Sequence, residues 1–124
     1  MNVVDSSGWL EYFGKAENSQ FFAPVIQKTD ILIVPTISVY EVYKKIALQC
    51  DEEEALSAIG WMSTGKIIEL SQQLALSAAV LSMEHQLPMA DSMILATARA
   101  HDATLWTQDE HFKDLEGIRY IGKK

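Results

Sequence analysis

Apolar residues in this chain occur either in short continuous runs or in longer segments with helical spacing. The clearest run, Ile31–Val34, consists of β-branched residues and leucine and is followed by Pro35. A continuous rather than alternating apolar run is typical of a strand covered on both faces, as in a parallel sheet. Similar patterns predict further strands at residues 2–5, 66–70, 104–107 and 118–121.

Segments with apolar residues three and four positions apart separate these strands and predict helices. The first of them begins at a Ser-Ser-Gly sequence, in which Ser6 or Ser7 is the expected N-cap. Thr36 or Ser38 is the expected N-cap of the third helix, and acidic residues open the fourth, where negative charge suits the helix dipole. The predicted helices span residues 6–14, 18–28, 36–49, 51–65, 71–85 and 89–100.

Strands that alternate with helices at this spacing predict a three-layer α/β/α sandwich around a mostly parallel sheet of four to five strands. A chain of 124 residues has the usual size of one domain, and we expect residues 1–124 to form a single domain. In open sheets of this kind, ligands gather at the carboxyl ends of the strands. Polar residues at those ends are therefore candidates for a common site.

The charge of the chain narrows the classes of function. A net charge of −7 and a pI of about 4.8 disfavour a protein that holds nucleic acid by electrostatics alone. The charge is compatible with an enzyme that contacts nucleic acid through metal ions, because the acidic ligands of the metal lower the net charge. It is also compatible with binding to a basic protein partner. The single Cys50 excludes an internal disulfide and favours the cytoplasm. No apolar run approaches the roughly 20 residues that cross a membrane.

Four acidic residues fall where the chain is expected to pass the carboxyl edge of the sheet. Asp5 ends the first strand, Asp109 follows the strand 104–107, and Glu41 and Asp91 lie near helix starts. Converging carboxylates raise one another's pKa, a penalty that a divalent cation removes. Oxygen ligands with room for water suit Mg²⁺ or Mn²⁺. Such a cluster is typical of phosphodiester hydrolysis, in which metal charge activates a water and stabilises the phosphate.

Each acid also has a purely structural interpretation. Asp5 can be a helix-start acid, Asp91 a helix cap and Asp109 a turn residue. Helical projection places Glu41 opposite the apolar side of its helix, where an exposed salt bridge to Lys45 is the default. Periodicity alone therefore does not select Glu41 as a site residue.

The four acids stand in sequence motifs that follow one another in a recognisable order. They are Val-Asp5-Ser-Ser, Ser-Val-Tyr-Glu41-Val, Leu-Pro-Met-Ala-Asp91-Ser-Met-Ile-Leu-Ala-Thr-Ala and Leu-Trp-Thr-Gln-Asp109-Glu-His-Phe. Together they resemble a PIN domain and, more narrowly, the VapC-type toxin ribonucleases of toxin–antitoxin pairs. The resemblance covers essentially the whole chain; each motif is weak by itself, whereas the ordered set is fairly specific.

This resemblance implies an endoribonuclease that depends on Mg²⁺ or Mn²⁺, cleaves RNA, forms a homodimer and is inhibited by a cognate antitoxin protein. It implies supporting roles for the hydroxyls of Ser6 and Thr107. Many proteins of this family carry another acid two residues after the last of the four, where this chain has His111. The resemblance therefore leaves open whether one or two metal ions are bound. We interpret His111 as a surface imidazole. The implied catalytic metal ligands are Asp5, Glu41, Asp91 and Asp109.

Two other functions remain as alternatives. An aspartyl-nucleophile phosphatase would use Asp5, but that chemistry usually has a second acid where this chain has Ser7. A catalytically silent PIN-like module would bind RNA or protein without cleavage. The complete set of four acids argues against the silent module.

Overall fold

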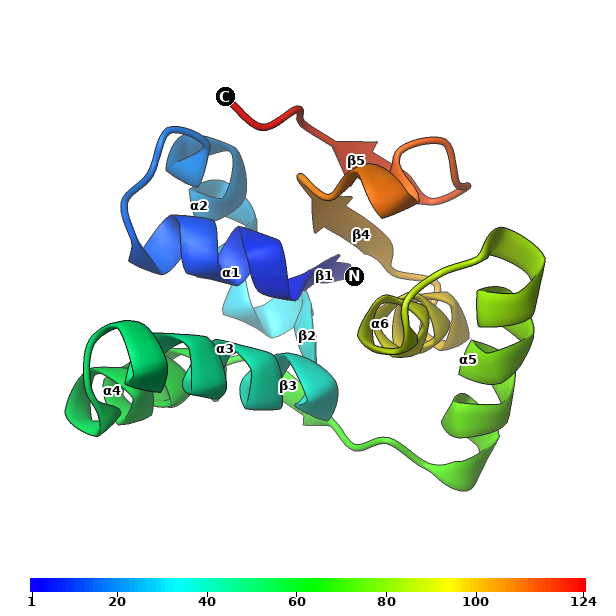
Figure 1. Ribbon diagram of the computed structural model, residues 1–124, viewed down its shortest axis with the longest axis horizontal. Coiled ribbons are helices and arrows are strands. Elements are labelled where there is room, and N and C mark those ends of the chain that lie inside the picture. Colours follow the sequence, from blue (N-terminus) through cyan, green and yellow to red (C-terminus); the bar gives the residue numbers. More distant parts are fainter.

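Five short strands form one sheet in which every neighbouring pair is parallel. The computed structural model describes residues 1–124. The spatial order of the strands is β3-β2-β1-β4-β5, so β1 is the central strand and all carboxyl ends lie at the same edge (Figure 1). The strands are Asn2–Val4 (β1), Leu32–Pro35 (β2), Lys66–Ile68 (β3), Thr104–Thr107 (β4) and Ile118–Tyr120 (β5).

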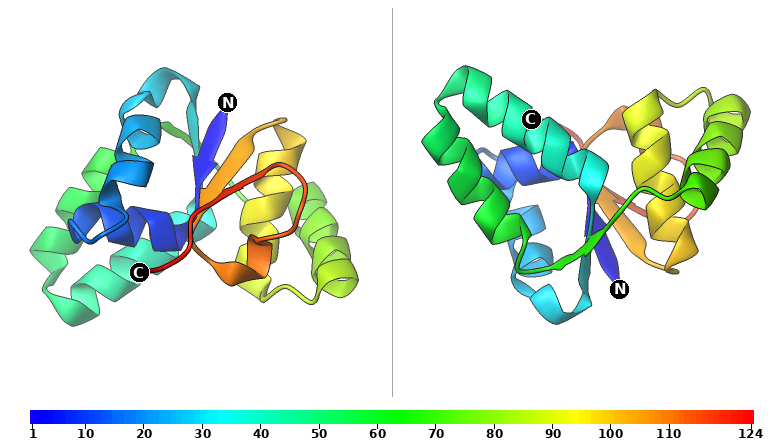
Figure 2. Two further views of the ribbon diagram at one scale, coloured as in Figure 1. Left: turned by 90° about the horizontal axis from the view of Figure 1, so that it is seen from above. Right: turned by 90° about the horizontal axis from the view of Figure 1, so that it is seen from below.

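Helices cover both faces of this sheet and confirm the predicted α/β/α sandwich. Helices α1 to α4 pack on one face and α5 and α6 on the other, as both views of Figure 2 show. None of the helices has the length and apolar character needed to cross a lipid bilayer. The helices are α1 (Ser6–Phe13), α2 (Ser19–Gln27), α3 (Thr36–Gln49), α4 (Glu52–Met62), α5 (Gln72–His85) and α6 (Met89–Ala100), with 3₁₀ turns η1 (Thr29–Ile31) and η2 (Glu110–Phe112).

The central strands are buried on both faces, as their continuous apolar sequences predict. Successive strand residues point to opposite sides of a sheet. Val3 and Ile33 accordingly pack under α5 and α6, whereas Val4 and Val34 pack under α1 to α4. The sandwich therefore has two hydrophobic cores, one on each side of the sheet.

The N-cap of α1 is Asp5 and not, as the sequence predicted, Ser6 or Ser7. The backbone of Asp5 is extended, and its Oδ1 atom accepts a hydrogen bond of 2.9 Å from the amide of Gly8. A carboxylate has about four acceptor positions, more than a serine hydroxyl, so it can cap the helix and still bind other groups. One residue thus ends the central strand and begins the helix.

Other element boundaries differ from the predictions by a few residues. Ile31 belongs to η1 rather than to the strand, and α3 begins at Thr36 with no side-chain N-cap, so that Ser38 lies within the helix. Helix α4 ends at Met62, before Gly65. Gly65 instead lies against β2, where a β-carbon would be 3.0 Å from a backbone carbonyl oxygen.

Close packing at Gly8 sets the position of α1 against the sheet. A β-carbon at Gly8 would lie 2.6 Å from Cγ1 of Val4 and 2.7 Å from Cε1 of Phe22, both fully buried. Because these side chains have no free space to move into, an added methyl group would overpack this contact. Gly60, in α4, has no atom within 4 Å of the corresponding position.

We expect Gly8→Ala to lower the free energy of unfolding by about 1–3 kcal/mol, although alanine is the better helix former. The matched control Gly60→Ala should raise it by about 0.5–1 kcal/mol, because only helix propensity changes there. Urea denaturation of the three proteins measures both effects. Equal stability of the two variants would contradict the close approach of α1 to β1 and α2.

Candidate active site

Asp5 is buried at the carboxyl end of the central strand, with 2% of its surface exposed. Its Oδ2 atom accepts a hydrogen bond of 2.7 Å from the hydroxyl of Thr107, which closes the neighbouring strand β4. The hydroxyl of Ser7 lies 2.8 and 2.9 Å from its two oxygens, and Gly8 provides the capping bond. Each oxygen of Asp5 thus lies within hydrogen-bond distance of two donors, which fix the orientation of the carboxylate.

Burial raises the pKa of Asp5 to about 6. The hydrogen bonds from Thr107, Gly8 and Ser7 lower this pKa, but they do not offset the loss of water around the carboxylate. The negative charge of Asp109 raises it further. The ionised form of Asp5 is therefore held at an energetic penalty in the folded, metal-free chain.

Glu41 lies half-buried against the start of α1 and not on a fully solvated helix face. In the second turn of α3, its Oε1 atom accepts a hydrogen bond of 2.7 Å from the hydroxyl of Ser6. The expected ion pair with Lys45 is not formed. The prediction failed because α3 packs against α1 as well as α4, and Ser6 at the start of α1 contacts Glu41.

Asp91 and Asp109 approach each other from α6 and from the turn after β4. Asp91 lies in the first turn of α6, and Asp109 caps η2 by accepting the backbone amide of His111 at 2.9 Å. The amide of Asp109 itself donates to the hydroxyl of Thr107 at 2.9 Å. Thr107 thereby connects Asp109 to the carboxylate of Asp5. Ser6 contacts Glu41, and Thr107 contacts both Asp5 and Asp109.

The imidazole of His111 lies between the two acids. Its Nδ1 atom is 2.8 Å from Oδ2 of Asp91 and 3.1 Å from Oδ1 of Asp109. The side chain is 54% exposed, so its expected surface location is correct, but its contact with both acids was not predicted. The hydrogen bond with Asp91 is the main cause that raises the pKa of His111.

The electrostatics of Asp91 link it to two of the other acids. Burial is the main cause that raises the pKa of Asp91, and the negative charges of Asp109 and, to a smaller extent, Glu41 raise it as well. The hydrogen bond with His111 lowers this pKa. The structure therefore brings the four predicted acids into one electrostatic cluster at the carboxyl edge. The left view of Figure 2 shows the starts of α1, α3 and α6 gathered with η2 at this edge, opposite the N-terminus.

The donor atoms in this cluster fit a divalent cation. One ligand atom each of Asp91, Asp109 and His111 lies within 4.8 Å of the others. Oxygen and imidazole nitrogen are both ordinary ligands of divalent metals. Asp5 interacts electrostatically with Asp109 of this group, and Glu41 with Asp91.

Two residues in the site, His111 and Ser7, were missing from the predicted site residues. Ser7 follows Asp5 by two positions, the spacing at which a hydroxyl can reach back to a capping carboxylate. His111 stands two residues after Asp109, where the family resemblance implied another acid. This departure from the expected motif is the signal that could have identified His111. Glu110 and Asp114, two other acids close to Asp109 in the sequence, are not in the group that could hold an ion.

Shallow hollows flank the acids on two sides. One, of about 240 Å³, is lined by Tyr40, Glu41, Lys44, Lys45 and Leu48. The other, of about 450 Å³, is lined by Asp109, Glu110, His111, Tyr120, Gly122 and Lys123. Because α3 follows β2 and Tyr120 closes β5, these hollows lie on opposite sides of β1 along the sheet edge. The site is open to a ligand that extends in both directions.

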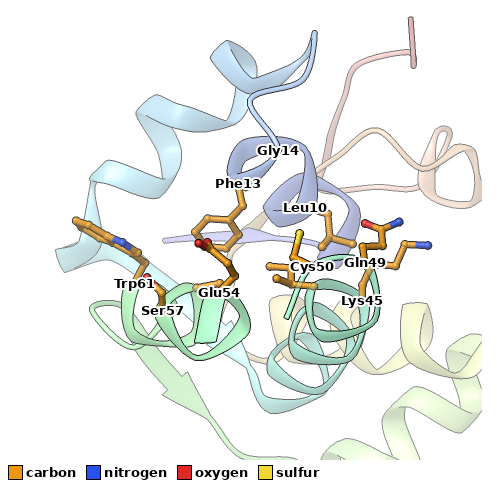
Figure 3. A pocket seen from close by; sticks show the side chains of 11 residues that line it. Leu10, Phe13, Gly14, Lys45, Gln49, Cys50, Glu54, Ser57 and Trp61 are labelled. Atoms are coloured by element: carbon orange, nitrogen blue, oxygen red, sulfur yellow. The ribbon is translucent and has the colours of Figure 1, made fainter. Parts of the chain in front are cut away.

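A separate pocket lies between α1, α3 and α4 and contains none of the four acids. Figure 3 shows the side chains of Phe13, Glu54 and Trp61 at one end and those of Lys45 and Gln49 at the other, with Cys50 and Leu10 between them. Its volume is about 330 Å³. The group of residues that could hold an ion lies outside this pocket.

Comparison with known proteins identifies the family. The family model described as PIN domain matches residues 3–118, so this chain belongs to the PIN domain family. No curated protein is similar enough in sequence to be matched. The resemblance seen in the ordered motifs is confirmed at the level of this family.

Solved structures share the fold at low sequence identity. A toxin–antitoxin complex from Klebsiella pneumoniae is 23% identical, with a TM-score of 0.80 and 96% of each chain covered. VapC20 of Mycobacterium tuberculosis, described as a toxin that cleaves the sarcin–ricin loop, is 14% identical, with a TM-score of 0.78 and coverage of 94% of this chain and 95% of that one. VapBC2 of Rickettsia felis, bound to promoter DNA, is 17% identical, with a TM-score of 0.74 and coverage of 98% and 97%.

The raised pKa of Asp5 predicts how the stability of the metal-free protein depends on pH. The folded chain binds this proton more tightly than the unfolded chain, so the free energy of unfolding should fall as the pH rises from about 4 to 6 and stay low above that. Asp5 should account for about 3 kcal/mol of this decrease in the free energy of unfolding, at 1.36 kcal/mol per pKa unit. Asp5→Asn keeps an oxygen for the helix cap but carries no charge.

Denaturation in EDTA at pH 4.5 and pH 7.5 measures this contribution as the difference between wild type and Asp5→Asn. The variant should gain stability relative to wild type at the higher pH. An equal pH dependence of the two proteins would show that burial does not penalise the ionised carboxylate of Asp5.

Proposed function

We propose that this chain is a divalent-metal-dependent endoribonuclease that hydrolyses RNA phosphodiester bonds as the toxin of a toxin–antitoxin pair. The main support is the convergence of four carboxylates at one edge of a PIN sheet, where burial and mutual repulsion raise the pKa of Asp5 and Asp91. Such an arrangement is unfavourable unless a cation neutralises it. In this proposal, residues 1–124 act as a single domain in the cytoplasm.

Mg²⁺ or Mn²⁺ would be held by the four acids Asp5, Glu41, Asp91 and Asp109. A bound divalent cation supplies positive charge that lowers the pKa of an attacking water and stabilises the phosphate. Thr107 orients Asp5 and the backbone of Asp109, and Ser6 orients Glu41. These hydroxyls keep the carboxylates in place before substrate arrives, which reduces reorganisation during the reaction.

The surroundings of the acids support a polymeric substrate. Hollows lie on both sides of them, one bordered by Lys44 and Lys45 and the other by Lys123. An extended strand of RNA can cross the acids with its flanking phosphates near these lysines. Because the chain carries a net charge of −7, these contacts are few, and binding would depend on the cation.

An aspartyl-nucleophile phosphatase is less well supported. The carboxylate of Asp5 is 2% exposed and caps α1 through the amide of Gly8. Phosphorylation of Asp5 would remove that cap and place a larger dianion in a buried position. Ser7 bonds to Asp5 and supplies no second acid.

A cognate antitoxin and a second copy of the chain are the proposed protein partners. Some of the solved structures with this fold are toxin–antitoxin complexes. Contiguous exposed apolar side chains generally mark protein contacts. Such side chains occur on α3 and α4 (Tyr40, Leu48, Leu56 and Trp61) and on α5 (Leu76, Val80 and Met83).

Cleavage of a pool of structured RNAs by antitoxin-free protein tests the nuclease directly. We expect wild type to cleave with Mg²⁺ or Mn²⁺ and not with EDTA, and Asp91→Asn to lose at least about a hundredfold in rate, because a ligand at the reacting centre is removed. Glu84→Gln makes the same change of charge on exposed α5 and should cleave like wild type.

Circular dichroism establishes that each variant is folded. Cleavage by Asp91→Asn at the wild-type rate would contradict the site. If folded wild type binds RNA but cleaves none of the pool with either metal, the catalytically silent binding module becomes the better explanation.

A further inference from the structure

His111 differs from the other histidines in what its ring contacts. His101 directs Nδ1 to the backbone carbonyl of Thr97 at 3.0 Å, and His85 lies 3.8 Å from Glu84, so neither ring contacts the four acids. His111 alone places a ring nitrogen within 3.1 Å of two of the clustered acids.

The local backbone fixes the imidazole in this position. Asp109 caps η2 by accepting the amide of His111, so the carboxylate and the imidazole belong to the same 3₁₀ turn. Asp91 reaches the same ring atom from α6. The three ligand atoms meet from two separately anchored elements, as the donor atoms of a metal site do.

The chemistry of this donor set differs from that of an all-carboxylate site. Mg²⁺ strongly prefers oxygen ligands and water. Imidazole nitrogen suits transition metals, and among these Mn²⁺ is the one that also suits carboxylate oxygen and water. Replacing one carboxylate by an imidazole removes a negative charge that Mg²⁺ would use and adds a ligand that Mn²⁺ can use.

We propose that Nδ1 of His111 is a direct metal ligand and that it gives the site a preference for Mn²⁺ over Mg²⁺. The inference rests on the proposed function, since it assumes that the acids hold a divalent cation. In the bound state the neutral ring carries its proton on Nε2, which forms no hydrogen bond within the protein. The ion would replace the proton on Nδ1, which in the absence of an ion lies between Asp91 and Asp109.

Electron spin-echo spectroscopy of the intact chain loaded with Mn²⁺ alone tests the ligand directly. A directly bound imidazole nitrogen gives a characteristic ¹⁴N modulation. We expect this signal in wild type and in the control His85→Gln, and its loss in His111→Gln. Absence of the signal in Mn²⁺-loaded wild type, or its persistence in His111→Gln, would overturn the proposal.

Competition between Mn²⁺ and Mg²⁺, followed by the signal of free Mn²⁺, tests the preference. His111→Asp restores a carboxylate, and we expect it to reduce the ratio of Mn²⁺ to Mg²⁺ affinity by about tenfold or more. An unchanged ratio would overturn the selectivity. Because the cleavage test depends on Asp91, these results leave the nuclease intact, whereas failure of wild type to bind Mn²⁺ at all contradicts both proposals.

Discussion

The hydrogen bond between Thr107 and Asp5 joins the end of the central strand β1 to the end of its neighbour β4, and the acidic site is arranged around it. Thr107 donates to the carboxylate of Asp5 and accepts a hydrogen bond from the amide of Asp109, so one buried hydroxyl connects the first and the last of the four acids. Asp5 in turn begins α1 by capping it at Gly8. Through α1, Ser6 reaches Glu41 on α3. A displacement of the strand ends would therefore move three of the four acids together.

The same arrangement places stability and function in opposition. Burial gives the carboxylates fixed positions but raises the pKa of Asp5 and Asp91, so each is held at a penalty when ionised. A bound cation offsets this penalty and couples ligand binding to folding. The imidazole of His111, which lies between Asp91 and Asp109, also reduces this penalty because its ring nitrogen donates to their oxygens.

The sequence predicted the elements of the fold well because burial leaves a strong local pattern in short parallel strands. The same rule located Asp5 and Asp109, since both follow strands that end at one edge. Glu41 was accessible only through the family resemblance, because its position depends on how α3 packs against α1. The contact of His111 depends on a 3₁₀ turn and on α6, which are far apart in the sequence, so no local pattern could predict it.

Thermal unfolding as a function of Mn²⁺ concentration at pH 7.5 tests most directly whether the acids form a metal site. Wild type should gain stability with the logarithm of metal concentration, by about 2.7 kcal/mol at a hundred times the dissociation constant. Asp91→Asn should be more stable without metal, since one penalised carboxylate is gone, and should gain little on addition of Mn²⁺. A wild type whose unfolding is insensitive to Mn²⁺, or a variant that responds equally, would contradict the account.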